Sequence, residues 1–153
     1  MAEPSDRPPS LVALSAAIVR GDRDAATEAT RAAIAADEPA GSILDAATDA
    51  MGIVGHRFAC KEIYVPEMLI AARAMKASMA VLDPVLVEVG IDPVATAVIG
   101  TVKGDLHDIG KNLVATMWRS ARLRVVDLGV DVEPEKFAQA KYVFPAPQLW
   151  ERK

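Results

Sequence analysis

Apolar residues recur every three or four positions through most of residues 10–88. That period places them on one face of an α-helix. Breaks in the pattern separate four stretches, whose predicted helices open at Ser10, Asp22, Ser42 and Pro66. Serine and aspartate are favoured helix N-caps, and proline is tolerated in the first helical turn. Four helices with short connections form an antiparallel bundle, so the sequence predicts a helical bundle over residues 10–88.

The same period predicts which side chains the bundle buries. The stripes of the third and fourth helices are Ile43, Ala47, Met51, Val54 and Phe58, and Leu69, Ala72, Met75, Met79 and Leu82. Methionines in such a stripe fill a core more often than they line a cofactor surface, so we expect Met75 and Met79 in the core. Gly21 is expected to close the first helix, and Asp83-Pro84 to end or kink the fourth.

The pattern changes after a predicted linker at residues 89–94. The apolar run Ala95–Gly100 is too short for a helix and is typical of a buried parallel strand. A helical pattern follows over Ile109–Ser120, then a second strand over Leu123–Leu128, and Pro134 opens a further helix. Alternating strands and helices predict a partial doubly wound, flavodoxin-like parallel sheet. The expected fold class is therefore α/β with an all-α N-terminal part.

The sheet is expected to be incomplete. A complete doubly wound domain needs about five strands, or about 120 residues or more, and about half of that remains after the bundle and linker. Beyond Phe137, the segment 142–150 holds two prolines and a tryptophan, which do not suit a further strand and helix. We expect a partial domain over residues 95–140, a divergent tail over 141–153 and a disordered lead over 1–9.

Composition and charge narrow the function classes. The 153-residue chain has a formal net charge of −4 and a pI near 5.2, so it lacks the basic character of a nucleic-acid-binding domain. Its single cysteine, Cys60, excludes an internal disulfide and fits a reducing compartment. Residues 1–10 lack the apolar core of a signal peptide, and no apolar run approaches the roughly 20 residues of a membrane span. These features predict a cytoplasmic protein with no nucleic-acid or membrane partner.

The candidate chemistry lies in the loop Gly104–Asn112, between the first predicted strand and its helix. In open parallel sheets, ligands bind outside the carboxyl ends of the strands. His107 can offer a neutral imidazole nitrogen to a metal, and Asp105 is placed to bind the other ring nitrogen. Gly104 and Gly110 lack side chains where a flat ligand would approach the backbone. The alternative from spacing alone is a polar loop with a helix-capping aspartate.

Other loop motifs do not fit this stretch. A P-loop has four residues between its glycines, followed by Lys and Ser or Thr. Here five residues separate Gly104 from Gly110, and Asn112 follows Lys111. The Gly-x-Gly of a dinucleotide-binding loop is absent before the helix. Two histidines and one cysteine, without a cluster, also argue against a zinc site.

The spacing Asp105-x-His107-x-x-Gly110 resembles the cobalamin-binding signature Asp-x-His-x-x-Gly. Residues 100–112 and 126–131 are similar to the corrinoid proteins of methyltransferase systems and to the cobalamin-binding region of methionine synthase. The resemblance implies that His107 replaces the nucleotide base of cobalamin as the lower ligand of cobalt, and that Asp105 hydrogen-bonds to it. The other loop residues implied in cofactor binding are Gly104, Leu106, Asp108, Ile109 and Gly110.

A second part of the resemblance lies in the bundle. Residues 54–58 and 64–69 are similar to the helical cap of the methyl-carrying corrinoid proteins, which shields the upper face of the corrin. Matched by position, Phe58 and Val65 would be the apolar residues above the cobalt. The alternative for both residues is plain bundle core.

The resemblance implies a corrinoid methyl carrier rather than a complete enzyme. Its cofactor would be cobalamin, as methylcobalamin or another corrinoid. Its partners would be a substrate-specific methyltransferase, an acceptor methyltransferase and a reductive activase. Two alternatives remain: a cobalamin-binding sensor or regulatory module, and a truncated fragment that no longer binds cobalamin.

Two departures from the family accompany this expectation. The Ser-x-Leu and Gly-Gly motifs that line the family's pocket for the nucleotide tail are absent, so the chain is expected to be C-terminally truncated relative to the family. Ala121-Arg122-Leu123 stands where the family usually has a glycine, which would place Arg122 in a left-handed conformation.

Exposed strand edges at Val98–Ile99 or Val125–Val126 would also favour a homo-oligomer.

Overall fold

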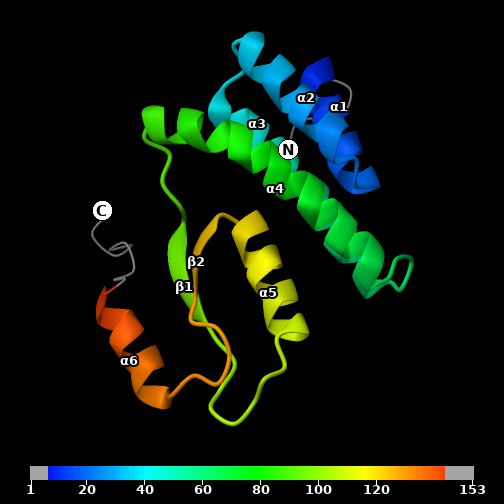
Figure 1. The fold of residues 1–153 in the computed structure, drawn as a ribbon. Coiled ribbons are helices and arrows are strands. Elements are labelled where there is room, and N and C mark those ends of the chain that lie inside the picture. The colour runs from blue at the N-terminus through cyan, green and yellow to red at the C-terminus, as the bar shows by residue number, and fades with distance from the viewer. Residues whose placement is uncertain (1–6, 144–153) are drawn as a thin grey trace. The chain divides into compact units, whose positions relative to one another are not determined.

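The computed structural model describes residues 7–143, except for the side chains of Ser120 and 141–143. The predicted lead and tail therefore lie largely outside the described residues. The chain forms two compact units, Met1–Asp92 and Pro93–Lys153, and each is described by itself. Figure 1 shows helices alone in the first unit and strands with helices in the second.

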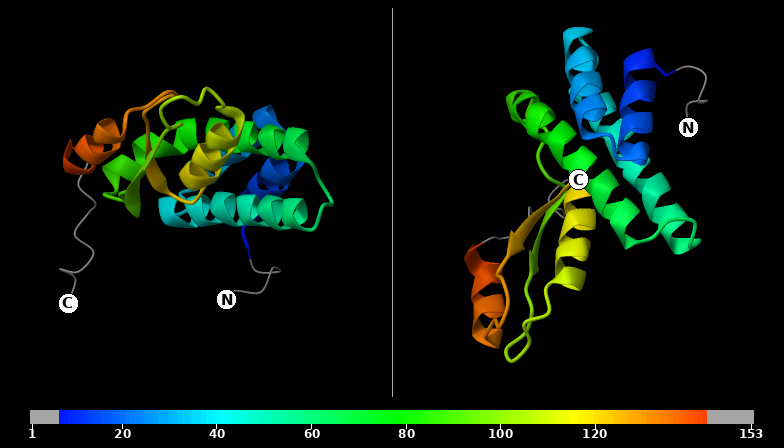
Figure 2. Two further views of the ribbon diagram at one scale, coloured as in Figure 1. Left: turned by 90° about the horizontal axis from the view of Figure 1, so that it is seen from below. Right: turned by 45° about the vertical axis from the view of Figure 1, so that its right-hand side comes forward.

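The first unit is a four-helix bundle (Figures 1 and 2). Its helices are α1 (Pro9–Arg20), α2 (Arg23–Ala35), α3 (Ala40–Ala59) and α4 (Val65–Glu88). Helix α1 packs against α2 and α3, and α4 packs against the same two helices. The predicted bundle is thereby confirmed.

The core of the bundle combines a few large side chains with many alanines. The largest fully buried ones are Leu14, Ile18, Ile43, Leu44, Met51, Leu82 and Val54. Buried alanines such as Ala26, Ala47 and Ala74 let neighbouring helices approach closely. Met75 is buried as predicted, whereas Met79 is only half-buried.

The helix ends agree with the sequence in part. Gly21 ends α1 with φ +73°, and a side chain there would collide with Ile70 of α4. The Asp22 side chain caps α2 by accepting a hydrogen bond from the Ala25 N–H at 3.0 Å. Both features follow from residue type: glycine suits a positive φ, and aspartate accepts from orphan helix N–H groups.

Two predicted helix starts were wrong, and one of the two outcomes predicted at Pro84, the end of the fourth helix, is excluded. Helix α1 begins at Pro9 rather than after a Ser10 cap, and α3 follows Pro39 rather than opening at Ser42. The fixed φ of proline suits a helix start, so it substitutes for a polar cap. Pro84 lies inside α4, which continues to Glu88. Leu82 and Leu86 are buried on either side of this proline, and their packing holds the last turns.

One buried polar pair joins α2 to α4. The hydroxyls of Thr30 and Ser78 lie 2.7 Å apart, and both residues are fully buried. The Thr30 hydroxyl donates to the carbonyl of Ala26 at 2.8 Å, so Ser78 must be the donor in the pair. The Ser78 hydroxyl thus depends on Thr30 as its acceptor, whereas Thr30 also has its own bond to Ala26.

We expect Thr30→Val to reduce the free energy of unfolding by about 1–3 kcal/mol, because the Ser78 hydroxyl loses its acceptor. Ser78→Ala should cost about 0.5–1.5 kcal/mol, since Thr30 keeps its bond to Ala26. The double variant should cost less than the sum of the two. Urea unfolding of the four proteins measures this coupling, and strictly additive losses would contradict the pairing.

The second unit has two parallel strands joined by a helix. Its elements are β1 (Ala95–Ile99), α5 (Ile109–Ser120), β2 (Leu123–Asp127) and α6 (Pro134–Val143). The register pairs Ala95 with Leu123 and Ile99 with Asp127. Figures 1 and 2 show α5 and α6 on opposite sides of the strands. The predicted partial α/β fold is confirmed.

Two details of this unit follow from single residues. Arg122 ends the α5–β2 connection with φ +65°, the left-handed conformation expected from the missing glycine. Gly100 lies under α6, where an added Cβ would come within 2.9 Å of the Phe137 ring. Within the described residues, each strand has one paired neighbour, so self-association through strand edges stays a prediction. None of the described helices is both long and apolar enough to span a membrane.

Candidate cofactor site

The histidine loop follows the carboxyl end of β1 and leads into α5. It opens with a turn in which the Asp105 N–H donates to the carbonyl of Val102 at 3.1 Å. Gly104 is the third residue of this turn and has φ +82°, as a type II turn requires. A Cβ at Gly104 would meet no atom within 4 Å. The backbone conformation thus explains this glycine in addition to the space predicted for a ligand.

Asp105 and His107 form the contact expected from their spacing. One oxygen of Asp105, Oδ1, accepts from the ring Nδ1 of His107 at 2.6 Å and from its backbone N–H at 2.9 Å. These donors, the backbone N–H first, hold the pKa of Asp105 below its usual range. With the ring proton on Nδ1, Nε2 keeps the lone pair that binds a metal. The His107 side chain is 98% exposed, so this nitrogen is accessible.

Several large apolar side chains of the two loops are exposed. Leu106 and Ile109, which lie within two residues of His107 in sequence, are each 73% exposed. Val102 earlier in the loop and Val130 in the loop after β2 are also exposed. Exposed large apolar side chains near a candidate ligand are available to contact a bound molecule.

The loop after β2 supports the histidine loop from the side. Val102 and Val132 form an isolated parallel bridge, and the Thr101 N–H donates to the Gly129 carbonyl at 2.9 Å. The Thr101 hydroxyl donates to the backbone carbonyl of His107 at 2.8 Å. Sequence analysis missed Thr101, whose only signal is its place directly after the apolar run that ends at Gly100.

Comparison with known proteins gives the family. Two profiles described as "B12 binding domain" match residues 11–83 and 95–148. A corrinoid protein from Desulfitobacterium hafniense is 33% identical over 81% of this chain and 59% of its own length. Trimethylamine corrinoid protein 2 from Methanosarcina acetivorans is 38% identical over 80% of this chain and 58% of its own.

Solved structures agree with the sequence comparisons. The methanol:cobalamin methyltransferase complex from Methanosarcina barkeri matches 95% of this chain and 59% of that chain, with TM-score 0.79 and 28% identity. A cobalamin-binding protein from D. hafniense matches 87% of this chain and 63% of that chain, with TM-score 0.70 and 30% identity. This chain belongs to the family of B12-binding corrinoid proteins. It spans somewhat less than two thirds of the length of these relatives. The match to the B12-binding profiles confirms the prediction of a cobalamin cofactor.

The described residues of this corrinoid protein fit a cobalt-containing macrocycle better than a bare metal ion. They contain no group of three or more His, Cys, Asp or Glu side chains that could hold a metal. His107 would therefore be a single protein ligand, which suits a metal whose other ligands come with the cofactor. The open space at Gly104 and Gly110 leaves the backbone beside the histidine accessible to a flat ring.

Some residues of the predicted site have roles that the sequence did not indicate. Asp108 precedes α5, but its side chain makes no cap bond and instead accepts from the Asn112 side chain at 3.1 Å. The alternative of a helix-capping aspartate is therefore wrong. Phe58, at the end of α3, is 38% exposed, and Val65, at the start of α4, is half-buried. Phe58 is not plain bundle core.

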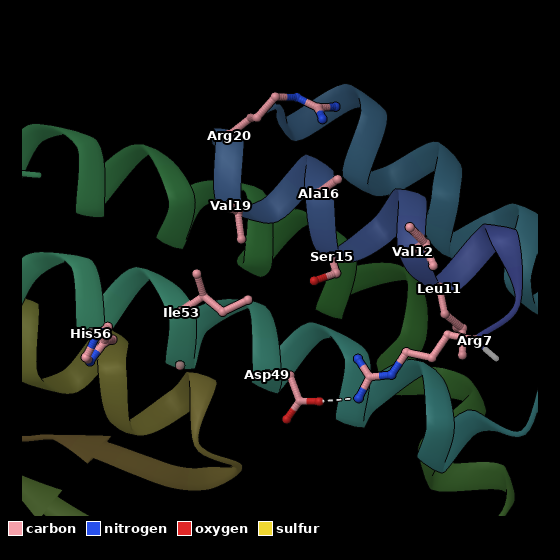
Figure 3. A pocket seen from close by; sticks show the side chains of 11 residues that line it. Arg7, Leu11, Val12, Ser15, Ala16, Val19, Arg20, Asp49, Ile53 and His56 are labelled. Atoms are coloured by element: carbon pink, nitrogen blue, oxygen red, sulfur yellow. Dashed lines mark hydrogen bonds and ion pairs between the residues drawn. The ribbon is translucent and has the colours of Figure 1, made fainter. Parts of the chain in front are cut away.

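A groove lies between α1 and α3, away from the histidine loop in sequence (Figure 3). Val12, Val19 and Ile53 are among its apolar lining residues, and Arg7 and Asp49, which also line it, form an ion pair at 2.6 Å. None of the predicted site residues lines this groove. The histidine loop is therefore the better candidate for the cofactor site.

An ion pair holds the start of α5 against the end of β2. Lys111 Nζ lies 2.6 Å from Asp127 Oδ2, and the lysine side chain is only 8% exposed. Asp127 Oδ1 also accepts from the Gly129 N–H at 2.9 Å. Lys111, followed by the Gly129 N–H, keeps the pKa of Asp127 below its usual range. This contact fixes the helix that follows the histidine loop.

We expect Lys111→Met to reduce the free energy of unfolding by about 1–3 kcal/mol, since it removes a charged hydrogen bond whose lysine side chain is only 8% exposed. The matched control is Lys103→Met, which breaks the exposed pair with Glu133 and should cost less than about 1 kcal/mol. Urea unfolding followed by Trp118 fluorescence, in a Trp150→Phe background, measures both losses.

The loss from Lys111→Met should also depend on pH. Because the folded pKa of Asp127 is lowered, its contribution is present above the unfolded pKa and disappears as pH falls through the folded value. The difference between wild type and Lys111→Met should therefore shrink below about pH 4. A difference that stays constant in acid would mean that packing of the lysine stem, not its charge, holds α5.

Proposed function

We propose that this chain is a corrinoid methyl carrier of a cobalamin-dependent methyltransferase system, with His107 Nε2 as the lower ligand of cobalt. The observation that carries the proposal is the 2.6 Å hydrogen bond from His107 Nδ1 to Asp105 on an almost fully exposed ring. It leaves one accessible lone pair with a fixed direction. Bound cobalamin would supply a cobalt centre that accepts a methyl group from one protein and gives it to another.

The loop residues would bind and orient the cofactor. Asp105 keeps the histidine in the tautomer that can bind a metal, and the exposed side chains of Leu106 and Ile109 offer apolar contacts to the ring. Gly104, Asp108 and Gly110 complete the loop. In the bundle, we propose Phe58 and Val65 as the apolar residues that shield the upper face, which the partial exposure of Phe58 supports.

Methyl transfer requires further proteins. The similarity to the methanol:cobalamin methyltransferase complex supports a substrate-specific methyltransferase as one partner. The relatives are named for trimethylamine, dimethylamine and methanol, so we propose a small methylated amine or alcohol as the donor. An acceptor methyltransferase and a reductive activase would complete the cycle.

His107→Ala should abolish ligation of the cobalt by a nitrogen of the protein. The protein is labelled with nitrogen-15 histidine, loaded with hydroxocobalamin and reduced to cobalt(II), because the cofactor's own base is also a nitrogen ligand. Electron paramagnetic resonance of the wild type should then show the doublet coupling of nitrogen-15, and His107→Ala should show no such doublet. The matched control is His56→Ala on α3, which removes the other histidine of the chain and should keep the doublet. A nitrogen-15 doublet that survives in His107→Ala, or is absent from the wild type, would refute the ligand assignment.

Asp105→Asn should keep the nitrogen ligand but weaken cobalamin binding by about 10–100-fold, because it weakens the bond that fixes the ring. Asp24→Asn is its control, since it makes the same change at an exposed carboxylate of α2, where Asp24 pairs with Arg23. Spectrophotometric titration with hydroxocobalamin gives the affinities. Equal affinities of the two variants would show that the Asp105–His107 bond does not contribute.

A further inference from the structure

Asp131 contacts the histidine loop at two successive residues. It lies in the loop after β2, and its Oδ1 accepts from the Gly104 N–H at 2.8 Å. Its own backbone N–H donates to the carbonyl of Asp105 at 3.2 Å. Asp131 thus binds the backbone of Gly104 and of Asp105, the last two residues of the turn.

The position of that turn decides where the Asp105 carboxylate points. Gly104 has φ +82°, a conformation open to many alternatives because glycine has no Cβ. A bond to its N–H selects one of them. Asp105 Oδ1 must then reach both the backbone N–H and the ring of His107, which lies only two residues away. A small rotation at Gly104 would break the shorter ring contact.

The rest of the second loop holds the two loops together without Asp131. Val102 and Val132 are bridged, Thr101 pairs with Gly129, and Lys103 Nζ lies 2.8 Å from Glu133. Loss of the Asp131 carboxylate should therefore leave the loops docked and release only the turn. This separates a role in orientation from a role in general stability.

We propose that Asp131 is a positioning residue for the cobalt ligand: it fixes the Gly104 turn, which directs Asp105 to His107 Nδ1 and so sets the tautomer and direction of the ring. The cofactor part of this inference rests on the proposed function. The orientation of the ring in the protein without cofactor does not, and it can be measured separately.

Three variants of the full chain separate the contributions. Asp131 has φ +53°, so alanine would add backbone strain to the loss of the side chain. Asp131→Gly removes the carboxylate but suits the left-handed conformation, and Asp131→Asn keeps both that conformation and an oxygen acceptor. Glu133→Gln is the control, because it weakens the exposed side-chain pair with Lys103 of the same turn but leaves the bond from the Gly104 N–H to Asp131 in place.

The first measurement uses the protein without cofactor. Nitrogen-15 NMR of the ring in mildly alkaline solution should show His107 with its proton on Nδ1 in the wild type, Asp131→Asn and Glu133→Gln. Asp131→Gly should show a mixture of both tautomers, and faster hydrogen exchange at the Gly104 N–H. An unchanged tautomer in Asp131→Gly would overturn the proposal, whatever the cofactor does.

The second measurement uses hydroxocobalamin. With histidine labelled by nitrogen-15, Asp131→Gly should bind it about tenfold more weakly than wild type, and a part of its cobalt(II) signal should lose the coupling to nitrogen-15. Asp131→Asn should restore both properties. Wild-type affinity with full coupling in Asp131→Gly, or equal loss in Asp131→Asn, would overturn the proposal. Absence of coupling in the wild type would refute the proposed function instead, while the tautomer measurement still decides the role of Asp131.

Discussion

The hydrogen bond between Asp105 and the ring of His107 is the interaction on which the candidate site depends. A histidine that is 98% exposed would otherwise sample several rotamers and both neutral tautomers. Here one carboxylate oxygen accepts from the ring Nδ1 and from the backbone N–H of the same residue. The contact with Asp105 therefore restricts both the rotamer and the tautomer of His107. As a result, the lone pair of Nε2 points in one direction although the ring is not buried.

That pair needs a backbone that brings the two residues together, and parallel strand topology supplies it. The carboxyl ends of β1 and β2 lie at the same edge of the sheet, so the loops that follow them run side by side. Thr101 binds the carbonyl of His107, and Lys111 fixes the first turn of α5 to the end of β2. The histidine loop is thus held at the carbonyl of His107 by Thr101 and at the first turn of α5 by Asp127 of β2.

Much of this architecture is local and was predicted from the sequence. Helical spacing predicted the four helices of the bundle, the short apolar runs predicted the strands, and the spacing Asp105-x-His107 predicted the central pair. The errors concern proline, which can begin a helix, end it or lie within it. Proline starts α1 in place of a polar cap, and Pro84 does not end α4, because buried neighbours on both sides stabilise the continuing helix.

Other features of the site were not predictable from one sequence. Lys111 and Asp131 act through partners that lie 16 and 27 positions away in the chain. Such contacts depend on the strand register, and a one-residue shift of β2 would replace both partners. Thr101 acts within the histidine loop, on the backbone carbonyl of His107, and no side-chain spacing marks that contact. Spacing rules apply within a loop or a helix, which is why they found Asp105 but not the residues that hold it in place.

The exposure of the loop has a thermodynamic consequence for what it can bind. Leu106 and Ile109 remain largely in water, although burial of apolar surface contributes about 25 cal/mol per Å². That free energy is therefore gained only when a ligand covers these side chains. Because hydrogen bonds already hold the turn, the carboxylate and the ring, binding costs little conformational entropy in the loop. A loop whose hydrogen bonds are already formed and whose apolar side chains are exposed suits a large ring that carries its own metal. The protein then needs to supply only one oriented nitrogen as a ligand.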